Sequence, residues 1–493
     1  MPQATTLGQL KESGYRSKSV KQELRDNLIQ RLKNKEDVFP GILGFDDTVL
    51  PDIHRAVLSR HSILLLGLRG QAKTRIARLL VNLLDEYIPV IAGSELNDDP
   101  LHPISRYGAD LVADLGDETP VEWLHRDARY VEKLATPDVS VADLIGDVDP
   151  IKAATLKLTY ADERVIHYGL VPRAHRGLFV INELPDLQAR IQVSLFNILQ
   201  EGDIQIRGFK LRLPLDIQFL FTANPEDYTN RGSIITPLKD RIESQILTHY
   251  PKTVDIARAI TRQEAQLVAD QSELVEVPEL LNVMLEQIAF AARESEYIDE
   301  KSGVSARLSI TALENLVSTA ERRALLNEDA ATVARVTDFW GVVPAITGKV
   351  ELVYEGEQEG AYGVAMKLLG ASIKQSFLAH FPDPNDSPAD GRSGSDPYGV
   401  IRAYFSGGNV AELLIDGSNE QYHAALDGVA GLRKFVTGHL DRELSEAETY
   451  LYMELVLQGL GEMEILSKEA LQNGLSFRDI LADMFGDDDL NFN

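Results

Sequence analysis

One stretch, ILLLGLRGQAKTRIARLLVNLL at 63–84, constrains the fold more than any other part of the chain. A continuous apolar run is followed by a glycine-containing loop and then by apolar residues at helical spacing. This pattern predicts a buried strand, a tight turn and a helix. Such a turn can present backbone N–H groups to a phosphate at the helix N-terminus. Lys73 and Thr74 stand where they would reach the β- and γ-phosphates and a Mg²⁺ ion.

The loop departs from the usual phosphate-binding pattern at one position. The string is G-x-x-G-x-A-K-T, and Ala72 takes the place of the last glycine of G-x-x-x-x-G-K-[ST]. Its Cβ is tolerated if φ is negative there and is damaging if the loop demands a positive φ. The alternative is an ordinary strand-to-helix turn. The candidate nucleotide-binding residues are Gly67, Gly70, Gln71, Ala72, Lys73 and Thr74.

Further short apolar runs alternate with helical patterns up to about residue 250. The strand candidates are 62–67, 88–93, 177–183, 217–225 and 244–250. Continuous apolar strands with helices between them predict a parallel sheet covered on both faces. Residues 203–213 differ, because apolar and polar residues alternate around Gly208, which predicts a β-hairpin.

Polar side chains follow two of these strands. Glu183 is the candidate for the carboxylate that orients the attacking water in ATP hydrolysis. The residue before it, normally an aspartate beside the metal, is Asn182, which can accept from a Mg²⁺-bound water but brings no charge. Asn224 ends another strand, and the carboxyl ends of parallel strands meet at one edge of a sheet. The alternatives are a solvated strand end for Glu183 and an Asn-Pro turn for Asn224.

Two arginines complete the set of candidates. Arg241 could stabilise a transferring phosphoryl group from a neighbouring subunit, although a lone arginine is usually a surface or ion-pair residue. Arg307 opens a helix for which Ser305 is a candidate N-cap.

Composition excludes several kinds of chemistry. There are no cysteines, so disulfides, thiol catalysis and thiolate metal sites are absent. The formal net charge of -27 disfavours broad binding to nucleic acid or to anionic membranes. No apolar run approaches the ~20 residues that a membrane span needs, and the N-terminus lacks the apolar segment of a signal peptide. We therefore expect a cytoplasmic protein.

In their order, the segments GLRGQAKT, LFVINE, FTANPEDY, PLKDRIES and SARLSITALENL resemble the phosphate loop, acidic strand, polar sensor, arginine finger and lid sensor of AAA+ ATPases. TPDVSVADLIGDVDP, GLVPRAHRGLFVINEL and FTANPEDYTNRGSIITPLKDRI are similar to the magnesium-chelatase ATPase subunit and to MoxR-type ATPases, as is the opening FPGILGFDD. The resemblance covers roughly residues 38 to 335.

The resemblance implies a ring, expected to be hexameric, with ATP and Mg²⁺ at the subunit boundaries. Lys73, Thr74, Glu183 and Asn224 would act from one subunit and Arg241 from its neighbour. Thr74 and Asn182 would lie on the metal side, and Arg307 on the lid would report the nucleotide state. Residues 151–176 would be the subgroup's helical insertion, and Arg207 and Lys210 would flank the tip of the hairpin, or else a solvated turn. Such relatives act with a partner that carries a von Willebrand A-type domain.

The expected fold is α/β: a P-loop AAA+ core with a parallel five-stranded sheet, a helical lid and an additional helical C-terminal region. The expected boundaries are an N-terminal helical segment at 1–38, the core with its insertion and hairpin at 39–252, the lid at 253–335, a helical extension at 336–381, a linker at 382–397 and a helical C-terminal domain at 398–493. The resemblance does not explain the residues beyond 335.

Three functions fit these features. The first is an ATP-hydrolysing motor that remodels a partner protein. The second is a nucleotide-gated assembly scaffold with little or no hydrolysis, which Ala72 and Asn182 favour. The third is a DNA-translocating ring, which the acidic charge opposes.

Overall fold

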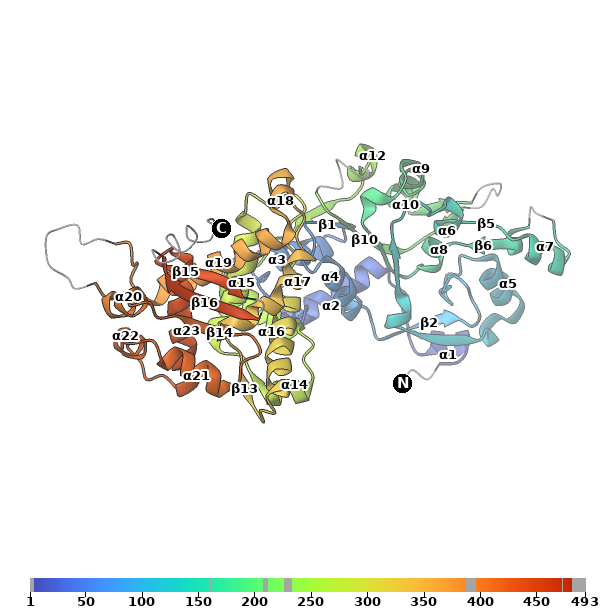
Figure 1. Ribbon diagram of the computed structural model, residues 1–493. Coiled ribbons are helices and arrows are strands. Elements are labelled where there is room, and N and C mark those ends of the chain that lie inside the picture. The colour runs from blue at the N-terminus through green and yellow to red at the C-terminus, as the bar shows by residue number, and fades with distance from the viewer. Residues whose placement is uncertain are drawn as a thin grey trace. The chain divides into compact units, whose positions relative to one another are not determined.

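The computed structural model describes residues 4–159, 162–206, 212–225, 233–386, 396–471 and 473–480. They form two compact units, which divide between Tyr250 and Pro251 (Figure 1). In these described ranges, no helix combines the length and apolar character that a membrane crossing requires.

Unit 1 is built on a five-stranded sheet in which every neighbouring pair is parallel, with the order β11-β1-β10-β7-β4. Its strands are β1 (Ile63–Leu66), β4 (Tyr130–Leu134), β7 (Gly177–Asn182), β10 (Ile217–Ala223) and β11 (Ser244–Leu247). Strands β1, β7 and β10 are buried at every position, as expected for the interior of a sheet covered on both faces. The predicted parallel five-stranded sheet is confirmed.

Successive residues of these strands enter two different hydrophobic clusters. Ile63 and Leu65 pack with helices α2 (Val20–Asn34), α3 (Val49–Leu58) and α4 (Lys73–Leu79). Leu64 and Leu66 pack on the opposite face with α9 (Ala189–Ser194) and α10 (Phe196–Glu201). The period-two alternation of strand side chains therefore builds two cores, one on each face of the sheet.

One predicted strand lies elsewhere. The segment 88–93 belongs to β2 (Tyr87–Ile91), which pairs antiparallel with β3 (Val121–His125) in a separate two-stranded sheet. The edge of the main sheet is β4 instead, whose sequence YVEKL contains charged residues and is only partly buried. An edge strand has a neighbour on one side only, so it does not need the continuous apolar run by which the inner strands were predicted.

The predicted insertion is of mixed structure. Residues 151–176 include most of α7 (Pro150–Leu156) and all of α8 (Leu170–Arg173), but also β6 (Ile166–Tyr168), which pairs antiparallel with β5 (Gly146–Val148). The other short helices of unit 1 are α1 (Leu7–Glu12), α5 (Arg106–Leu115), α6 (Val141–Leu144) and α12 (Thr236–Lys239).

The hairpin predicted at 203–213 is present. It is formed by β8 (Asp203–Gln205) and β9 (Arg212–Pro214), which pair antiparallel. Its expected tip residues Arg207 and Lys210 lie outside the described residues.

Unit 2 is mainly helical and is held by one hydrophobic cluster that runs from Val275 to Phe477. The cluster draws on the predicted lid, extension and C-terminal domain alike, while most of the predicted linker lies outside the described residues. Its helices are α13 (Val254–Glu264), α14 (Ala269–Leu274), α15 (Glu279–Glu294), α16 (Arg307–Leu326), α17 (Val343–Thr347), α18 (Tyr354–Glu359), α19 (Ala361–His380), α20 (Gly399–Ser406), α21 (Asn419–Asp427), α22 (Leu432–His439) and α23 (Glu446–Glu462).

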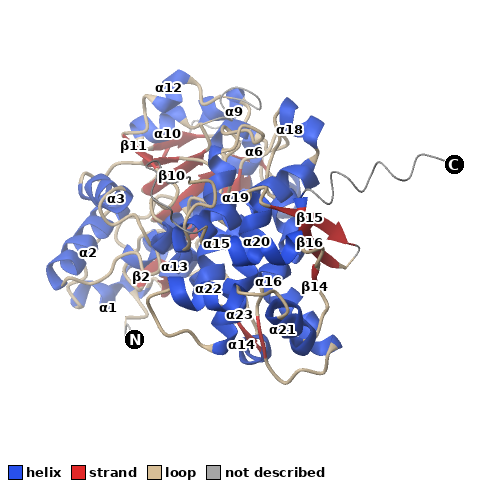
Figure 2. Ribbon diagram, turned by 60° about the vertical axis from the view of Figure 1, so that its left-hand side comes forward, coloured by secondary structure: helices blue, strands red, loops and turns tan. Residues whose placement is uncertain are grey.

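The C-terminal region also contains a sheet that the sequence analysis did not predict. Strands β14 (Ala411–Leu414), β15 (Leu466–Leu471) and β16 (Gly474–Asp479) form an antiparallel sheet in the order β14-β16-β15, at one side of the helices of unit 2 (Figure 2). A second, two-stranded parallel pair joins β12 (Val275–Glu276) to β13 (Thr332–Val333). The predicted helices are present, and these strands are additional to them.

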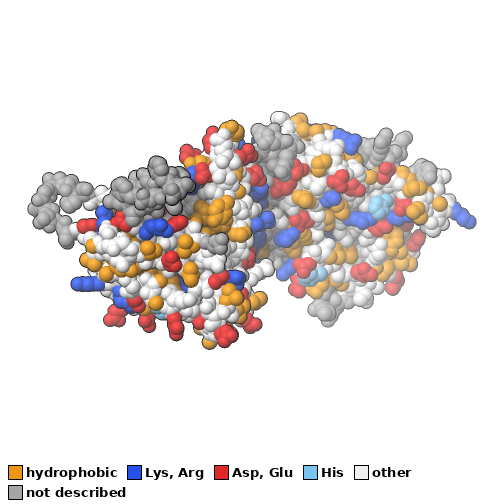
Figure 3. Space-filling model, in the orientation of Figure 1, with side chains coloured by type: hydrophobic (Ala, Val, Ile, Leu, Met, Phe, Trp, Pro, Cys, Tyr) orange, Lys and Arg blue, Asp and Glu red, His pale blue; other side chains and the backbone are white. Residues whose placement is uncertain are grey.

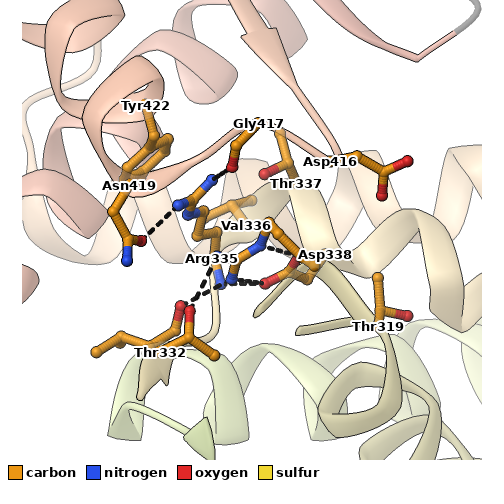
Figure 4. A network of polar contacts seen from close by, with 12 residues as sticks. Thr319, Thr332, Arg335, Val336, Thr337, Asp338, Asp416, Gly417, Asn419 and Tyr422 are labelled. Atoms are coloured by element: carbon orange, nitrogen blue, oxygen red, sulfur yellow. Dashed lines mark hydrogen bonds and ion pairs between the residues drawn. The ribbon is translucent and has the colours of Figure 1, made fainter. Parts of the chain in front are cut away.

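A buried polar network ties together distant segments of unit 2 (Figure 4). The Arg335 guanidinium donates to the Gly417 carbonyl at 2.9 Å and to Oδ1 of Asn419 at 2.7 Å. The fully buried carboxylate of Glu454, on α23, accepts from the backbone N–H of Thr337 at 2.7 Å, and burial raises its pKa. The segment that follows α16 is therefore bonded to the C-terminal region on two sides.

Candidate functional site

The turn between β1 and α4 is tightly packed at its first glycine. A Cβ on Gly67 would lie 1.9 Å from Oγ1 of Thr248 and 2.2 Å from Oε1 of Gln71, so only glycine fits. Those two side chains are bonded to each other, because the Thr248 hydroxyl donates to Gln71 at 2.7 Å. The predicted binding residue Gln71 thus fastens the loop to the end of β11.

The same turn contains two residues in the left-handed region. Gly70 has φ +72°, which costs a glycine nothing. Ala72 has φ +55° and ψ 12°, and it is the residue that precedes α4. The loop therefore demands the conformation in which a Cβ is unfavourable, by about 1 kcal/mol or more.

Lys73 is the first residue of α4, and it is only 7% exposed. Its ammonium donates to the Gly67 carbonyl, to the Leu68 carbonyl at 2.8 Å and to Oδ1 of Asn224 at 2.8 Å. A buried lysine is uncommon, and it persists where its charge is held by oxygen atoms. The side chain thus reaches across the turn to the end of β10.

Asn224 connects this lysine to the predicted catalytic carboxylate. Its Nδ2 donates to Oε2 of Glu183 at 3.0 Å. Glu183 directly follows β7 and has φ +54°, again in the left-handed region, which is unusual for a residue with a Cβ. The structure therefore brings Lys73, Asn224 and Glu183 together at the carboxyl end of the sheet, where ligands of such sheets bind.

Asn182, the last residue of β7, lies between two neighbouring strands and is 7% exposed. Its Oδ1 accepts from the Thr222 hydroxyl at 3.1 Å, and that hydroxyl also accepts from the Glu183 N–H at 3.2 Å. Its Nδ2 donates to Oε1 of Glu132, on β4, at 2.5 Å. The sequence analysis missed Glu132 and Thr222. Glu132 lies in β4, a strand that was not predicted, and no sequence motif marks it as a site residue.

The donor set of this region suits a phosphate and a hard cation. It offers an ammonium, a hydroxyl at Thr74 in the first turn of α4, a carboxylate at Glu183 and an amide oxygen at Asn182. Oxygen ligands are those that Mg²⁺ prefers. In the described part of the chain, no three His, Asp or Glu side chains cluster in a way that could bind a metal by themselves.

Arg241 lies apart from this cluster. Its guanidinium donates twice to Oε1 of Gln200, at 3.0 and 2.8 Å, and once to the Pro237 carbonyl at 2.7 Å. It also lies over the ring of Phe196, 4.8 Å from the centroid. The side chain is thus held against α10 and α12 of its own chain.

Arg307 belongs to unit 2 and is exposed. It is the first residue of α16, and its N–H donates to the Ser305 hydroxyl at 3.2 Å. The residue directly before the helix is Ala306, so Ser305 binds the helix end from one position further out than a regular N-cap.

The chain is similar to known proteins over part of its length. Residues 157–246 match the family model of the Sigma-54 interaction domain, an AAA+ domain. Over 212 residues the chain is 26% identical to the magnesium-chelatase 38 kDa subunit of Cereibacter sphaeroides. The matched stretch covers 41% of this chain and 56% of that protein. These matches support an AAA+ ATPase of the magnesium-chelatase type.

A second relative gives the same result. The magnesium-chelatase 38 kDa subunit of Rhodobacter capsulatus is 25% identical over 241 residues, covering 48% of this chain and 63% of that protein. The chain therefore spans less than two thirds of the length of the curated relatives it matches. A model of the complex between subunits BchI and BchD of magnesium chelatase, based on cryo-EM, is 19% identical and covers 65% of this chain and 98% of that one, with a TM-score of 0.33.

Proposed function

We propose that this chain binds ATP with Mg²⁺ at the carboxyl ends of β1, β7 and β10, hydrolyses it slowly, and uses the cycle to remodel a partner protein. The observation that carries the proposal is the bonded series Lys73–Asn224–Glu183. In this series Asn224, which we assign as the polar sensor, bonds both to the lysine proposed to bind the phosphates and to the carboxylate proposed to orient water. Hydrolysis of a nucleoside triphosphate requires these three functions.

Each candidate residue has a part in this proposal. Lys73 and the loop N–H groups would bind the β- and γ-phosphates, and Thr74 and Asn182 would lie on the side of the Mg²⁺ ion. Glu183 would orient the attacking water, and Asn224 would contact the γ-phosphate. Mg²⁺ would neutralise charge on the phosphates as the terminal phosphoryl group passes to water.

Two features support slow rather than fast hydrolysis. Ala72 holds a left-handed conformation that its Cβ disfavours, and Asn182 brings no charge to the metal side. Each 1.4 kcal/mol lost from transition-state stabilisation slows a reaction about tenfold. The uncharged amide therefore fits a slowed cycle without abolishing it.

The ring and the partner are further parts of the proposal. We infer a ring, expected to be hexameric, in which Arg241 acts on the nucleotide of the neighbouring subunit, because its contacts lie with Gln200 and Pro237 and not with Lys73 or Glu183. Arg307 on the lid would respond to the nucleotide. A partner with a von Willebrand A-type domain, and the MoxR-like chaperone role, are proposed from the family type alone.

Phosphate release by the purified full chain tests the proposal. Lys73→Ala should abolish nucleotide binding, whereas Glu183→Gln should retain binding and lose turnover. Lys33→Ala and Glu122→Gln are matched controls at exposed positions of unit 1 and should behave as the wild type. Binding without measurable phosphate release in the wild type would favour the second function, a nucleotide-gated scaffold, which Ala72 and Asn182 support.

Translocation along DNA has less support. The formal net charge is -27, and acidic and basic side chains are interspersed on the face seen in Figure 3. Binding to phosphate backbones depends on concentrated basic charge. A mobility shift with duplex DNA that weakens steeply with salt would revive this function.

A further inference from the structure

The amide of Asn182 has only one orientation that satisfies both of its neighbours. A carboxylate can accept hydrogen bonds but cannot donate them, so the amide nitrogen has to face Glu132, 2.5 Å away. The amide oxygen is then left to accept from the Thr222 hydroxyl at 3.1 Å. Glu132 thereby decides which way the Asn182 side chain is turned.

This orientation directs the oxygen toward β10. In the sheet order β11-β1-β10-β7-β4, Glu132 lies on the outer side of β7 and Thr222 on the inner side. The inner neighbour β10 leads to Asn224, which holds Lys73. The atom that could accept from a metal-bound water thus faces the strand that ends at Asn224, and the nitrogen faces the edge of the sheet.

Glu132 is itself held in place for this contact. Its Oε2 accepts from Nε of Arg78 at 3.2 Å and from the Tyr130 hydroxyl at 3.0 Å, which leaves Oε1 for Asn182. Its side chain is 22% exposed, while Arg78 is 64% exposed. The carboxylate is therefore sheltered, and its counter-ion is in solvent, where an ion pair is weak.

We propose that Glu132 is a positioning residue of this site, which turns the oxygen of Asn182 toward the Mg²⁺ side and supplies the negative charge that the end of β7 lacks. This inference rests on the proposed nucleotide function. A carboxylate bonded to an amide polarises it, so the amide oxygen becomes a better acceptor. Residues that orient a metal's partners in this way commonly change metal affinity by about 10- to 100-fold when mutated.

The proposal also explains why the residue at 182 is not an aspartate. Asn182→Asp would place two carboxylates within about the 2.5 Å that now separates Asn182 from Glu132, and like charges at such distances repel. The exchanged pair Asn182→Asp with Glu132→Gln removes this repulsion, because the glutamine amide can donate to the new aspartate. The usual aspartate at the end of β7 is thus replaced by Asn182, and the negative charge is carried instead by Glu132 on β4.

Calorimetric titration of ATP into the purified full chain tests this, with excess Mg²⁺ and with EDTA. In the wild type, Mg²⁺ should raise the affinity for ATP. Glu132→Gln should make this increase about tenfold smaller, the scale of one charged hydrogen bond, and should leave the affinity for ATP in EDTA unchanged. Glu132→Leu should lower that gain at least as far. Asn182→Asp/Glu132→Gln should restore it to the wild-type value or above, and Glu122→Gln, the same change at an exposed position, should have no effect.

The outcomes separate the inference from the proposed function. Equal losses with and without Mg²⁺, accompanied by a lowered melting temperature, would mean that Glu132 is only structural and would overturn the inference. An unchanged Mg²⁺ effect in a stably folded Glu132→Gln would overturn it as well, with nucleotide binding intact. A wild type that binds no ATP in either condition would overturn the proposed function and the inference together.

Discussion

The ammonium of Lys73 lies 2.8 Å from Oδ1 of Asn224, and the nitrogen of the same amide lies 3.0 Å from the Glu183 carboxylate. One asparagine therefore stands between a cation and an anion and bonds to both. The two charged groups are kept in reach of each other through a neutral group. When Lys73 binds a phosphate, its ammonium has to give up the hydrogen bond to Asn224 or to donate to both groups.

Replacing that neutral bridge by a charged one should weaken nucleotide binding. Asn224→Asp adds negative charge beside Glu183 and gives Lys73 a stronger partner, so the lysine is less available to a triphosphate, which is itself repelled. We expect ATP affinity to fall about tenfold or more, the size of one charged hydrogen bond. Calorimetric titration measures it, and Asn224→Ala, which adds no charge, should bind more tightly than Asn224→Asp. Wild-type affinity in Asn224→Asp would contradict this role for the bridge.

The left-handed conformation of Ala72 predicts a stabilising substitution. Ala72→Gly should raise the free energy of unfolding of unit 1 by about 1 kcal/mol, because glycine adopts a φ of +55° without the Cβ penalty. The chain has two tryptophans, Trp123 in unit 1 and Trp340 in unit 2. Urea unfolding followed by Trp123 fluorescence in a Trp340→Phe background reports unit 1 alone.

The control for this substitution lies five residues further on, inside α4. Ala77→Gly is the same chemical change at a buried helical position, where glycine costs about 1 kcal/mol and the lost methyl group adds to the cost. The two substitutions should therefore change stability in opposite directions. A loss of stability in both would show that the loop does not require a left-handed residue at 72.

A buried histidine predicts how the stability of unit 1 depends on pH. Burial lowers the pKa of His175 to about 4, with a further contribution from Arg176, and Nδ1 accepts from the Asp216 N–H at 3.0 Å. The unfolded chain, with an ordinary pKa of about 6.5, binds the proton first as the pH falls. The stabilising contribution is therefore complete above pH ~6.5 and is lost on the way down to pH ~4, for a total of about 3 kcal/mol.

His175→Asn removes the titration and keeps an acceptor for Asp216. Its free energy of unfolding, followed by Trp123 fluorescence between pH 7 and 4, should fall less steeply than that of the wild type. His125→Asn, at a more exposed position, should retain the wild-type slope. Parallel curves for wild type and His175→Asn would contradict the assignment.

Two adjacent arginines of α16 should differ strongly in their effect on unit 2. Arg323 and Asp338 form an ion pair at 2.9 Å with both side chains 0% exposed. Removing one partner of a buried pair costs about 3–5 kcal/mol, so Arg323→Met should destabilise unit 2 by that amount. Arg322 pairs with Asp416 at the surface, and Arg322→Met should cost less than about 1 kcal/mol. Unfolding followed by Trp340 fluorescence in a Trp123→Phe background measures both, and equal losses would contradict the distinction.

The inner strands of the sheet could be predicted from the sequence, because a strand that is buried on both faces appears in the sequence as a continuous apolar run. Strands β1, β7 and β10 carry that signal, and the polar residues that follow them, Glu183 and Asn224, are indeed bonded to each other. The edge strand β4 carries no such signal, because half of its surroundings are solvent. Glu132 was missed with it, since a side chain's partner across a sheet depends on strand order, which the local pattern does not contain.

The C-terminal sheet had a signal that was not used. Asn473-Gly474 lies at the start of β16, and an Asn-Gly pair beside extended segments is a strong hairpin indicator. The conformation of Ala72 is a different case. The sequence posed the question of its φ, but only the closure of the loop against Thr248 and Asn224 answers it. The assignments of Arg241 and Arg307 stay predictions.

The bonds of Arg335 and Glu454 limit how unit 2 can move. Gly417 and Asn419 are joined to the segment after α16, and α23 is joined to it through Thr337, while one hydrophobic cluster fills the space between them. Breaking any of these bonds would leave a buried charge without one of its partners. The segment that follows α16 and helix α23 are therefore cross-braced into one body, and neither end of the network can be substituted without affecting the other.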